Sequence, residues 1–208
     1  HLRSRAEAGE VVAGTPDAVL GHNVTGQPSP EAGHAARTQL YNLELDTWDP
    51  TLCDLFGIPE ASLPALEPSI GHRGEWQGVP LTAVAGDQQA ALLAHGGWHA
   101  GITAAHFGTG AFVLTGTGPT TLRQPGLLSA VLASSSSQRH FQLEGAVNSA
   151  GAAMDWISTR TGLGPEAWGQ RPLEPERLPR VLPAISGLAT PWWRPEIQIG
   201  RAHVNTSH

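Results

Sequence analysis

The stretch Val84-Ala85-Gly86-Asp87-Gln88-Gln89-Ala90-Ala91-Leu92 decides how the rest of this chain is interpreted. The apolar run at residues 81–85 is short and lies between a proline and a glycine, a pattern typical of a buried strand. Residues 88–94 are helix formers. We therefore expect Asp87 at a strand-to-helix turn, where ligands tend to bind in open α/β sheets.

Two roles are open for Asp87. At the start of a helix, an aspartate commonly acts as an N-cap that accepts hydrogen bonds from unpaired backbone amides. A carboxylate in the same place could instead act as a general base and take the proton of a substrate hydroxyl during phosphoryl transfer. Position alone favours the N-cap.

A second motif, Phe107-Gly108-Thr109-Gly110-Ala111-Phe112, follows about twenty residues later. Its Gly-Thr-Gly triplet predicts a tight hairpin turn that needs glycine dihedral angles. The alternative is that the small residues let backbone amides and the Thr109 hydroxyl approach nucleotide phosphates. Apolar runs separated by turn residues predict an antiparallel meander; the four runs are residues 102–107, 111–116, 126–133 and 140–145.

Two helices can be placed from their ends. Pro16 suits the first turn of a helix over about residues 17–22. Asp49 followed by Pro50 predicts an N-cap and a first helical residue, and Gly57 marks the end of that helix. We interpret this part of the chain, including Cys53, as scaffold.

Composition excludes several classes of protein. The chain has 208 residues and a net charge of −6 with only 12 Lys and Arg, so it has no basic surface of the kind that nucleic acid or an anionic membrane requires. No apolar run approaches the roughly 20 residues of a membrane-spanning helix. A single cysteine excludes a disulfide framework and a cysteine metal site. We therefore expect a cytoplasmic protein with neither a nucleic-acid nor a membrane partner.

The two motifs together, Gly-Asp-Gln-Gln-Ala-Ala and then Phe-Gly-Thr-Gly-x-Phe, resemble the FGGY family of carbohydrate kinases. The resemblance extends over roughly residues 9–195 and implies an α/β, actin-like (ribonuclease H-like) two-domain sugar kinase fold, incomplete in both domains. It implies that residues 1–100 end the first domain and that residues 101–195 begin the second. Residues 196–208 do not follow the family, and we expect them to be a non-native tail.

The resemblance also implies the reaction and its residues. The reaction is transfer of the γ-phosphoryl group of ATP to a hydroxyl of glycerol, with Mg²⁺ on the phosphates. Asp87 would be the base and a metal ligand, and Gln88 and Phe112 would contact glycerol. The nucleotide would lie against Gly108, Thr109, Gly151 and Asp155.

Alternatives remain open at this point. Asp155 and residues 148–149 depart from the family pattern, so another polyol or sugar is a possible substrate. A non-catalytic binding module of the same fold is a further alternative, although packing requires neither Asp87 nor Gln88. We expect the 208-residue chain alone to be inactive and its full-length parent to be a possible homo-oligomer.

Overall fold

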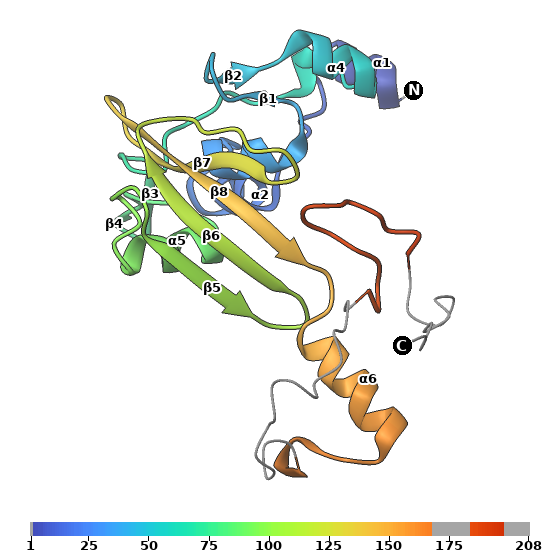
Figure 1. Ribbon diagram of the computed structural model, residues 1–208. Helices are drawn as coiled ribbons and strands as arrows, with labels where there is room; N and C mark the ends of the chain where they lie inside the picture. The colour runs from blue at the N-terminus through green and yellow to red at the C-terminus, as the bar shows by residue number, and fades with distance from the viewer. Residues whose placement is uncertain (1, 168–183, 198–208) are drawn as a thin grey trace. The chain divides into compact units, whose positions relative to one another are not determined.

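The computed structural model of the chain describes residues 2–167 and 184–197 (Figure 1). The chain divides into two compact units. The first contains residues 1–104, 115–123 and 129–143, and the second contains residues 105–114, 124–128 and 144–208. Residues 168–183, and residues 198–208 of the expected tail, lie outside the described residues.

The N-terminal half of the chain consists of short helices and two-stranded ribbons. In order, its elements are α1 (Leu2–Glu7), α2 (Pro16–Thr25), α3 (Ala32–Ala35), η1 (Ala36–Thr38), β1 (Tyr41–Asn42), β2 (Thr47–Trp48), α4 (Pro50–Phe56), η2 (Glu60–Ser62), β3 (Glu75–Trp76), β4 (Val79–Pro80) and α5 (Asp87–Ala94). Strands β1 and β2 pair antiparallel with Tyr41 opposite Trp48, and β3 and β4 pair antiparallel with Trp76 opposite Val79.

A four-stranded sheet follows, and then a helix. Its strands are β5 (Thr103–Phe107), β6 (Ala111–Gly118), β7 (Leu128–Ser134) and β8 (Arg139–Val147), followed by α6 (Gly151–Thr161) and η3 (Pro165–Ala167). All four expected strands form, but the meander prediction was wrong. The spatial order is β5-β6-β8-β7, so β8 lies between β6 and β7 (Figure 1).

The end of β7 is bonded to an earlier part of the chain. Ser134 at the end of β7 accepts the backbone amide of Ile70 at 2.9 Å, and its own amide donates to the Ser69 hydroxyl at 2.9 Å. Strand β7 is thus tied to a segment 65 residues earlier in the chain. These bonds satisfy backbone groups that an edge strand would otherwise expose.

Both helix predictions are confirmed, and α2 extends three residues beyond the expected end. The carboxylate of Asp49 accepts the backbone amides of Thr51 and Leu52 at 2.9 and 3.2 Å, as an N-cap does. Pro50 is the first residue of α4, and Gly57 ends the helix with a φ of 67°, a left-handed conformation that favours glycine.

The prediction of a buried strand at residues 81–85 was wrong. Only an isolated bridge between Ala83 and Ile70 forms there, and none of the five residues is buried. Backbone amides of Gly71 and Arg73 donate to carbonyls of this segment at 2.9 and 2.8 Å, so it pairs antiparallel with the irregular chain before it. Small Ala and Thr side chains supply little apolar surface to drive burial.

The core of the first unit is small. Its buried cluster consists of Ala32, Ala35, Tyr41, Val131 and Phe141. Burial and a hydrogen bond to Asp46 raise the pKa of Tyr41, so its hydroxyl stays protonated and donates to that carboxylate. Cys53 is also buried, which raises the pKa of its thiol and agrees with the scaffold role expected for it.

Candidate functional site

Asp87 is the first residue of α5, and Gly86 is the N-cap. The N-cap role considered for Asp87 is therefore wrong by one residue, because Gly86 already has the extended backbone that an N-cap needs (φ −65°, ψ 153°). Oδ1 of Asp87 accepts the amide of the next residue, Gln88, at 2.8 Å. The side chain is exposed, so its second oxygen faces solvent on a helix end that favours negative charge.

Gln88 carries an unsatisfied polar atom beside this carboxylate. Its Oε1 is buried and has no hydrogen-bond partner among the residues that the structure describes. A buried amide oxygen without a partner is destabilising by about 1–3 kcal/mol, which makes it a natural acceptor for a ligand hydroxyl. Gln89 is buried and folds back over Gly86, where a Cβ would collide with its amide oxygen.

In the second unit, the glycine hairpin and the start of α6 lie together. The amide of Gly151 donates to the carbonyl of Gly108 at 2.8 Å, and the amide of Ala152 donates to the carbonyl of Thr109 at 3.1 Å. A Cβ on Gly151 would lie 2.7 Å from the Gly108 carbonyl oxygen, so only glycine permits this approach. The hairpin that the sequence predicts is therefore present, and its glycine packs against α6.

These contacts determine which groups a phosphate could reach. The two amides at the start of α6 are already bonded to the hairpin, so they are occupied in this structure. The Thr109 side chain is exposed, and its hydroxyl has no hydrogen-bond partner within residues 2–167 and 184–197. Among these groups, the Thr109 hydroxyl is the one that remains available to an anion.

The other two predicted residues lie on β6 and α6. Phe112 is half-buried on β6, with part of its ring accessible. Asp155 is exposed on the second turn of α6. The structure thus brings Gly108, Thr109 and Gly151 together in the second unit and places Asp87 next to Gln88 in the first.

Sequence reasoning missed a cluster of ionisable side chains in the first unit. Nδ1 of His34 lies 3.3 Å from Oε2 of Glu31 and 3.7 Å from Oδ2 of Asp17. Both carboxylates are almost completely buried, with side-chain exposures of 2% and 5%. Glu31 is the N-cap of α3, and a capping carboxylate three residues before a histidine is the local signal that could have revealed the pair.

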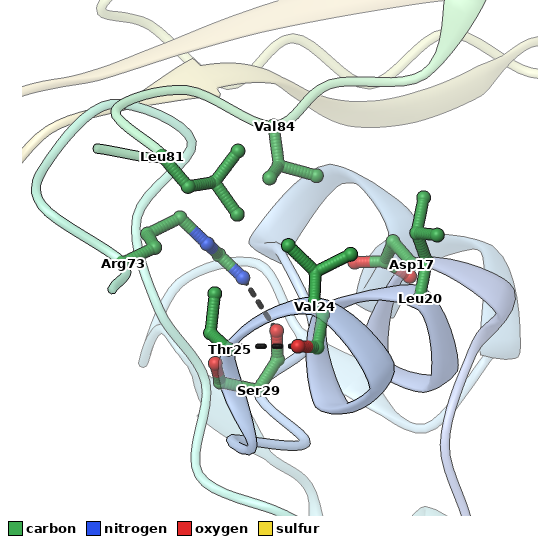
Figure 2. Close-up of a pocket in the computed structure, with 9 residues that line it drawn as sticks. Asp17, Leu20, Val24, Thr25, Ser29, Arg73, Leu81 and Val84 are labelled. Atoms are coloured by element: carbon green, nitrogen blue, oxygen red, sulfur yellow. Dashed lines mark hydrogen bonds between the residues drawn. The ribbon is translucent and has the colours of Figure 1, made fainter. Parts of the chain in front are cut away.

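A pocket of about 130 Å³ is lined in part by Asp17 of this cluster (Figure 2). Its walls are mainly the apolar side chains of Leu20, Val24, Leu81 and Val84. Arg73 closes one side, where its guanidinium donates to the backbone carbonyl of Ser29. Since the wall includes both Val84 and Asp17, the pocket connects α2 to the stretch that leads into Asp87.

Within residues 2–167 and 184–197, no group of three or more His, Cys, Asp and Glu side chains is arranged to hold a metal ion. In the same ranges, no helix combines the length and the apolar character needed to cross a bilayer.

Residues 1–94 match the N-terminal domain of the FGGY family of carbohydrate kinases. The chain belongs to this family. In this FGGY chain the matched segment ends with α5, so it includes both Asp87 and Gln88.

Two relatives of this chain are glycerol kinases. The chain is 37% identical over 216 residues to the glycerol kinase of Corynebacterium glutamicum (strain R), a match that covers 93% of this chain and 42% of the relative. It is 39% identical over 201 residues to that of Rippkaea orientalis, which covers 88% of this chain and 39% of the relative. This FGGY chain therefore spans about two-fifths of the length of the relatives it matches.

Solved structures confirm the fold class. The crystal structure of Plasmodium falciparum glycerol kinase with ADP superposes with a TM-score of 0.77 at 24% identity and covers 94% of this chain and 42% of that one. A xylulose kinase from Lactobacillus acidophilus superposes with a TM-score of 0.72 at 18% identity and covers 86% and 39%. The FGGY chain thus has the expected actin-like (ribonuclease H-like) α/β fold, as a part of the full-length kinases.

Proposed function

We propose that this chain carries the catalytic carboxylate of a kinase that transfers the γ-phosphoryl group of ATP to glycerol. The observation that supports this most directly is the pair at the start of α5. Asp87 presents an exposed carboxylate, and Gln88 beside it has a buried amide oxygen with no partner among the described residues. A hydroxyl that donates to Gln88 would lie next to the carboxylate that accepts a proton.

Each side chain then has a role in the reaction. Asp87 takes the proton of the attacking hydroxyl as general base. Gln88 orients glycerol by hydrogen bonding, and the ring of Phe112 packs against the carbon atoms of glycerol. Positioning of this kind supplies most of the catalysis in phosphoryl transfer.

The nucleotide side of the proposal rests on the hairpin and α6. The Thr109 hydroxyl would donate a hydrogen bond to a phosphate oxygen. Gly108 and Gly151 have no side chains, so the nucleotide could approach the backbone closely. Asp155, exposed on α6, would face a more distant part of ATP. Because the amides of α6 are already bonded to the hairpin, the proposal assigns the phosphate to the Thr109 hydroxyl.

The donor set at Asp87 fits Mg²⁺. This ion usually takes one or two protein carboxylates, with water and substrate phosphates completing its octahedron, so a three-residue cluster is not required. Asp87 would hold the ion through the oxygen that does not accept the Gln88 amide. When bound, Mg²⁺ would neutralise charge on the phosphates.

The test measures ADP production when residues 1–195 replace the equivalent segment of the Corynebacterium glutamicum relative. We expect glycerol-dependent turnover, with kcat reduced at least about 100-fold by Asp87→Asn and a smaller effect on KM. Asp54→Asn is the matched control, because Asp54 is an exposed carboxylate on α4.

The same turnover assay distinguishes the two alternatives, a kinase for another substrate and a binding module without activity. Turnover with another polyol or sugar but not with glycerol would keep the kinase and change its substrate. A folded chimera without turnover on any of them would contradict the kinase and leave the binding module. A cytoplasmic location and a possible homo-oligomer of the whole protein are part of the same proposal.

A further inference from the structure

The cluster of Asp17, Glu31 and His34 is a closed hydrogen-bond network inside the first unit. Oε2 of Glu31 accepts the backbone amide of His34 at 3.0 Å, and Oε1 accepts the hydroxyl of Ser69. Oδ2 of Asp17 accepts the backbone amide of Glu31 at 2.7 Å. Oδ1 of Asp17 is buried and has no partner in the described part of the chain. Two carboxylates are thus held in a site from which water is almost excluded.

Such a pair needs a positive charge nearby, because an uncompensated buried carboxylate is strongly destabilising. When protonated, the imidazole of His34 supplies this charge, because its Nδ1 is within 4 Å of both carboxylates. Its hydrogen bond to Glu31 raises the pKa of His34, burial opposes this rise, and the charge of Asp17 adds to it. His34 is therefore more basic than a free imidazole.

Other charged groups around the cluster do not replace His34. Arg37 lowers the pKa of His34 by repulsion. The guanidinium of Arg73 donates to the carbonyls of Ser29 and Pro68 and lies 3.5 Å from Glu67. Asp87, at the nearby end of α5, bonds to its own helix.

The network contacts the Asp87 turn at two points. A methyl group in place of the hydrogen of Gly86 would lie 3.8 Å from Cε1 of His34, so the imidazole faces the N-cap of α5 across the space that a side chain would fill. Ser69, whose hydroxyl donates to Glu31, accepts the amide of Val84 on its carbonyl at 2.9 Å. Val84 is therefore bonded to Ser69, and Gly86 faces the imidazole of His34.

We propose that protonated His34 is a positioning residue for the turn at residues 84–87, and that loss of its proton loosens this turn. Neutral imidazole can still donate one hydrogen bond to Glu31, but it no longer compensates the charge of Asp17. For a group whose pKa is raised by folding, stabilisation is fully present below the unfolded pKa, about 6.5, and is lost as pH rises through the folded value. The proposal does not depend on the function of Asp87.

The test follows two signals of the isotope-labelled 208-residue chain from pH 5.5 to 9 by NMR. One is the Cε1 proton of His34, and the other is the hydrogen-exchange protection of the Val84 amide. The Ala152 amide, in the other unit, serves as the internal reference. We expect His34 to titrate above 6.5. The protection of Val84 should fall between pH 6.5 and the folded-state pKa of His34, by about tenfold for each pH unit by which that pKa is raised. Constant Val84 protection through the His34 titration would overturn the proposal.

Three variants separate positioning from simple packing. His34→Gln should remove the pH dependence of Val84 protection, whereas the matched control His22→Gln, exposed on α2, should retain it. Asp17→Asn removes one of the two negative charges, so the midpoint of the His34 titration should move to lower pH. The protection of Val84 should still depend on pH. An unchanged midpoint in folded Asp17→Asn would contradict the proposal, and this holds even if His34→Gln does not fold.

Discussion

Arg73 and Arg123 illustrate how the value of a single charged residue depends on burial. The Arg73 side chain is 4% exposed and donates to two backbone carbonyls, of Pro68 and Ser29. The Arg123 side chain is 68% exposed and lies 3.1 Å from Glu44, which is also largely exposed. Removing a buried charged donor leaves its acceptors without hydrogen bonds and lowers the free energy of unfolding. Removing one partner of a solvated ion pair changes this free energy little.

We therefore predict that Arg73→Met lowers the free energy of unfolding by about 2–4 kcal/mol. Arg123→Met, the matched control, should change it by less than about 1 kcal/mol. Urea unfolding followed by circular dichroism measures both differences. Equal losses in the two variants would contradict the assignment of Arg73 as a structural cation.

Single residues were also where sequence reasoning reached its limit. Asp87 and Gln88 were identified from a contiguous motif, and the structure leaves their proposed roles to be tested. Arg73 carries no such local signal, because its partner Ser29 lies 44 residues away. The capping carboxylate of Glu31 is a local signal for His34, but Ser69 joins the cluster from a distant segment. Glu31 and Ser69, for example, are 38 residues apart.

At the scale of an element, α4 depends on its N-cap. Asp49 accepts the amides of Thr51 and Leu52, and its other oxygen accepts the side-chain amide of Asn42 at 2.9 Å. These bonds favour the ionised form and lower the pKa of Asp49, the Asn42 bond most of all. The contribution of the cap is thus present above the unfolded pKa and is lost as pH falls through the lower folded value.

Asp49→Ala should therefore lower the melting temperature by about 2–4 °C at pH 7 and have almost no effect near pH 2. Asp49→Asn should retain much of the stability at both pH values, since asparagine also caps helices well. Differential scanning calorimetry at the two pH values measures this. A loss in Asp49→Ala that is the same at both would show that the cap does not act through its charge.

Elements whose ends are set locally were the most predictable. Helices α2, α4 and α5 and the hairpin between β5 and β6 formed where proline, aspartate and glycine indicated. The strand expected at residues 81–85 did not form, because its partner is the irregular segment before β3 rather than a sheet strand. Strand pairing is decided by the partner more than by the strand itself.

At the scale of the whole molecule, charge governs which large partners can bind. The net charge is −6, with 18 Asp and Glu against 12 Lys and Arg. Binding to a polyanion requires release of counterions by several clustered cations, and this composition supplies few.

We predict that the chain passes through a heparin column without retention at 0.15 M salt and binds double-stranded DNA more weakly than about 10⁻⁴ M. A basic DNA-binding domain run on the same column is the positive control. Retention that is lost as the salt concentration rises would reveal a cationic surface that the composition does not predict.

The sequence by itself determined the family, the α/β class, the positions of α2, α4, α5 and the four strands β5 to β8, and the motif at Asp87 and Gln88. Capping, turn formation and helix propensity act over a few neighbouring residues, so they can be read along the chain. Only the tertiary structure decided that β8 lies between β6 and β7, that residues 81–85 are not buried, and that His34 joins Asp17 and Glu31. Those features depend on which distant segments meet, as Ser69 and Ser134 do, and on the charges that become buried when they meet.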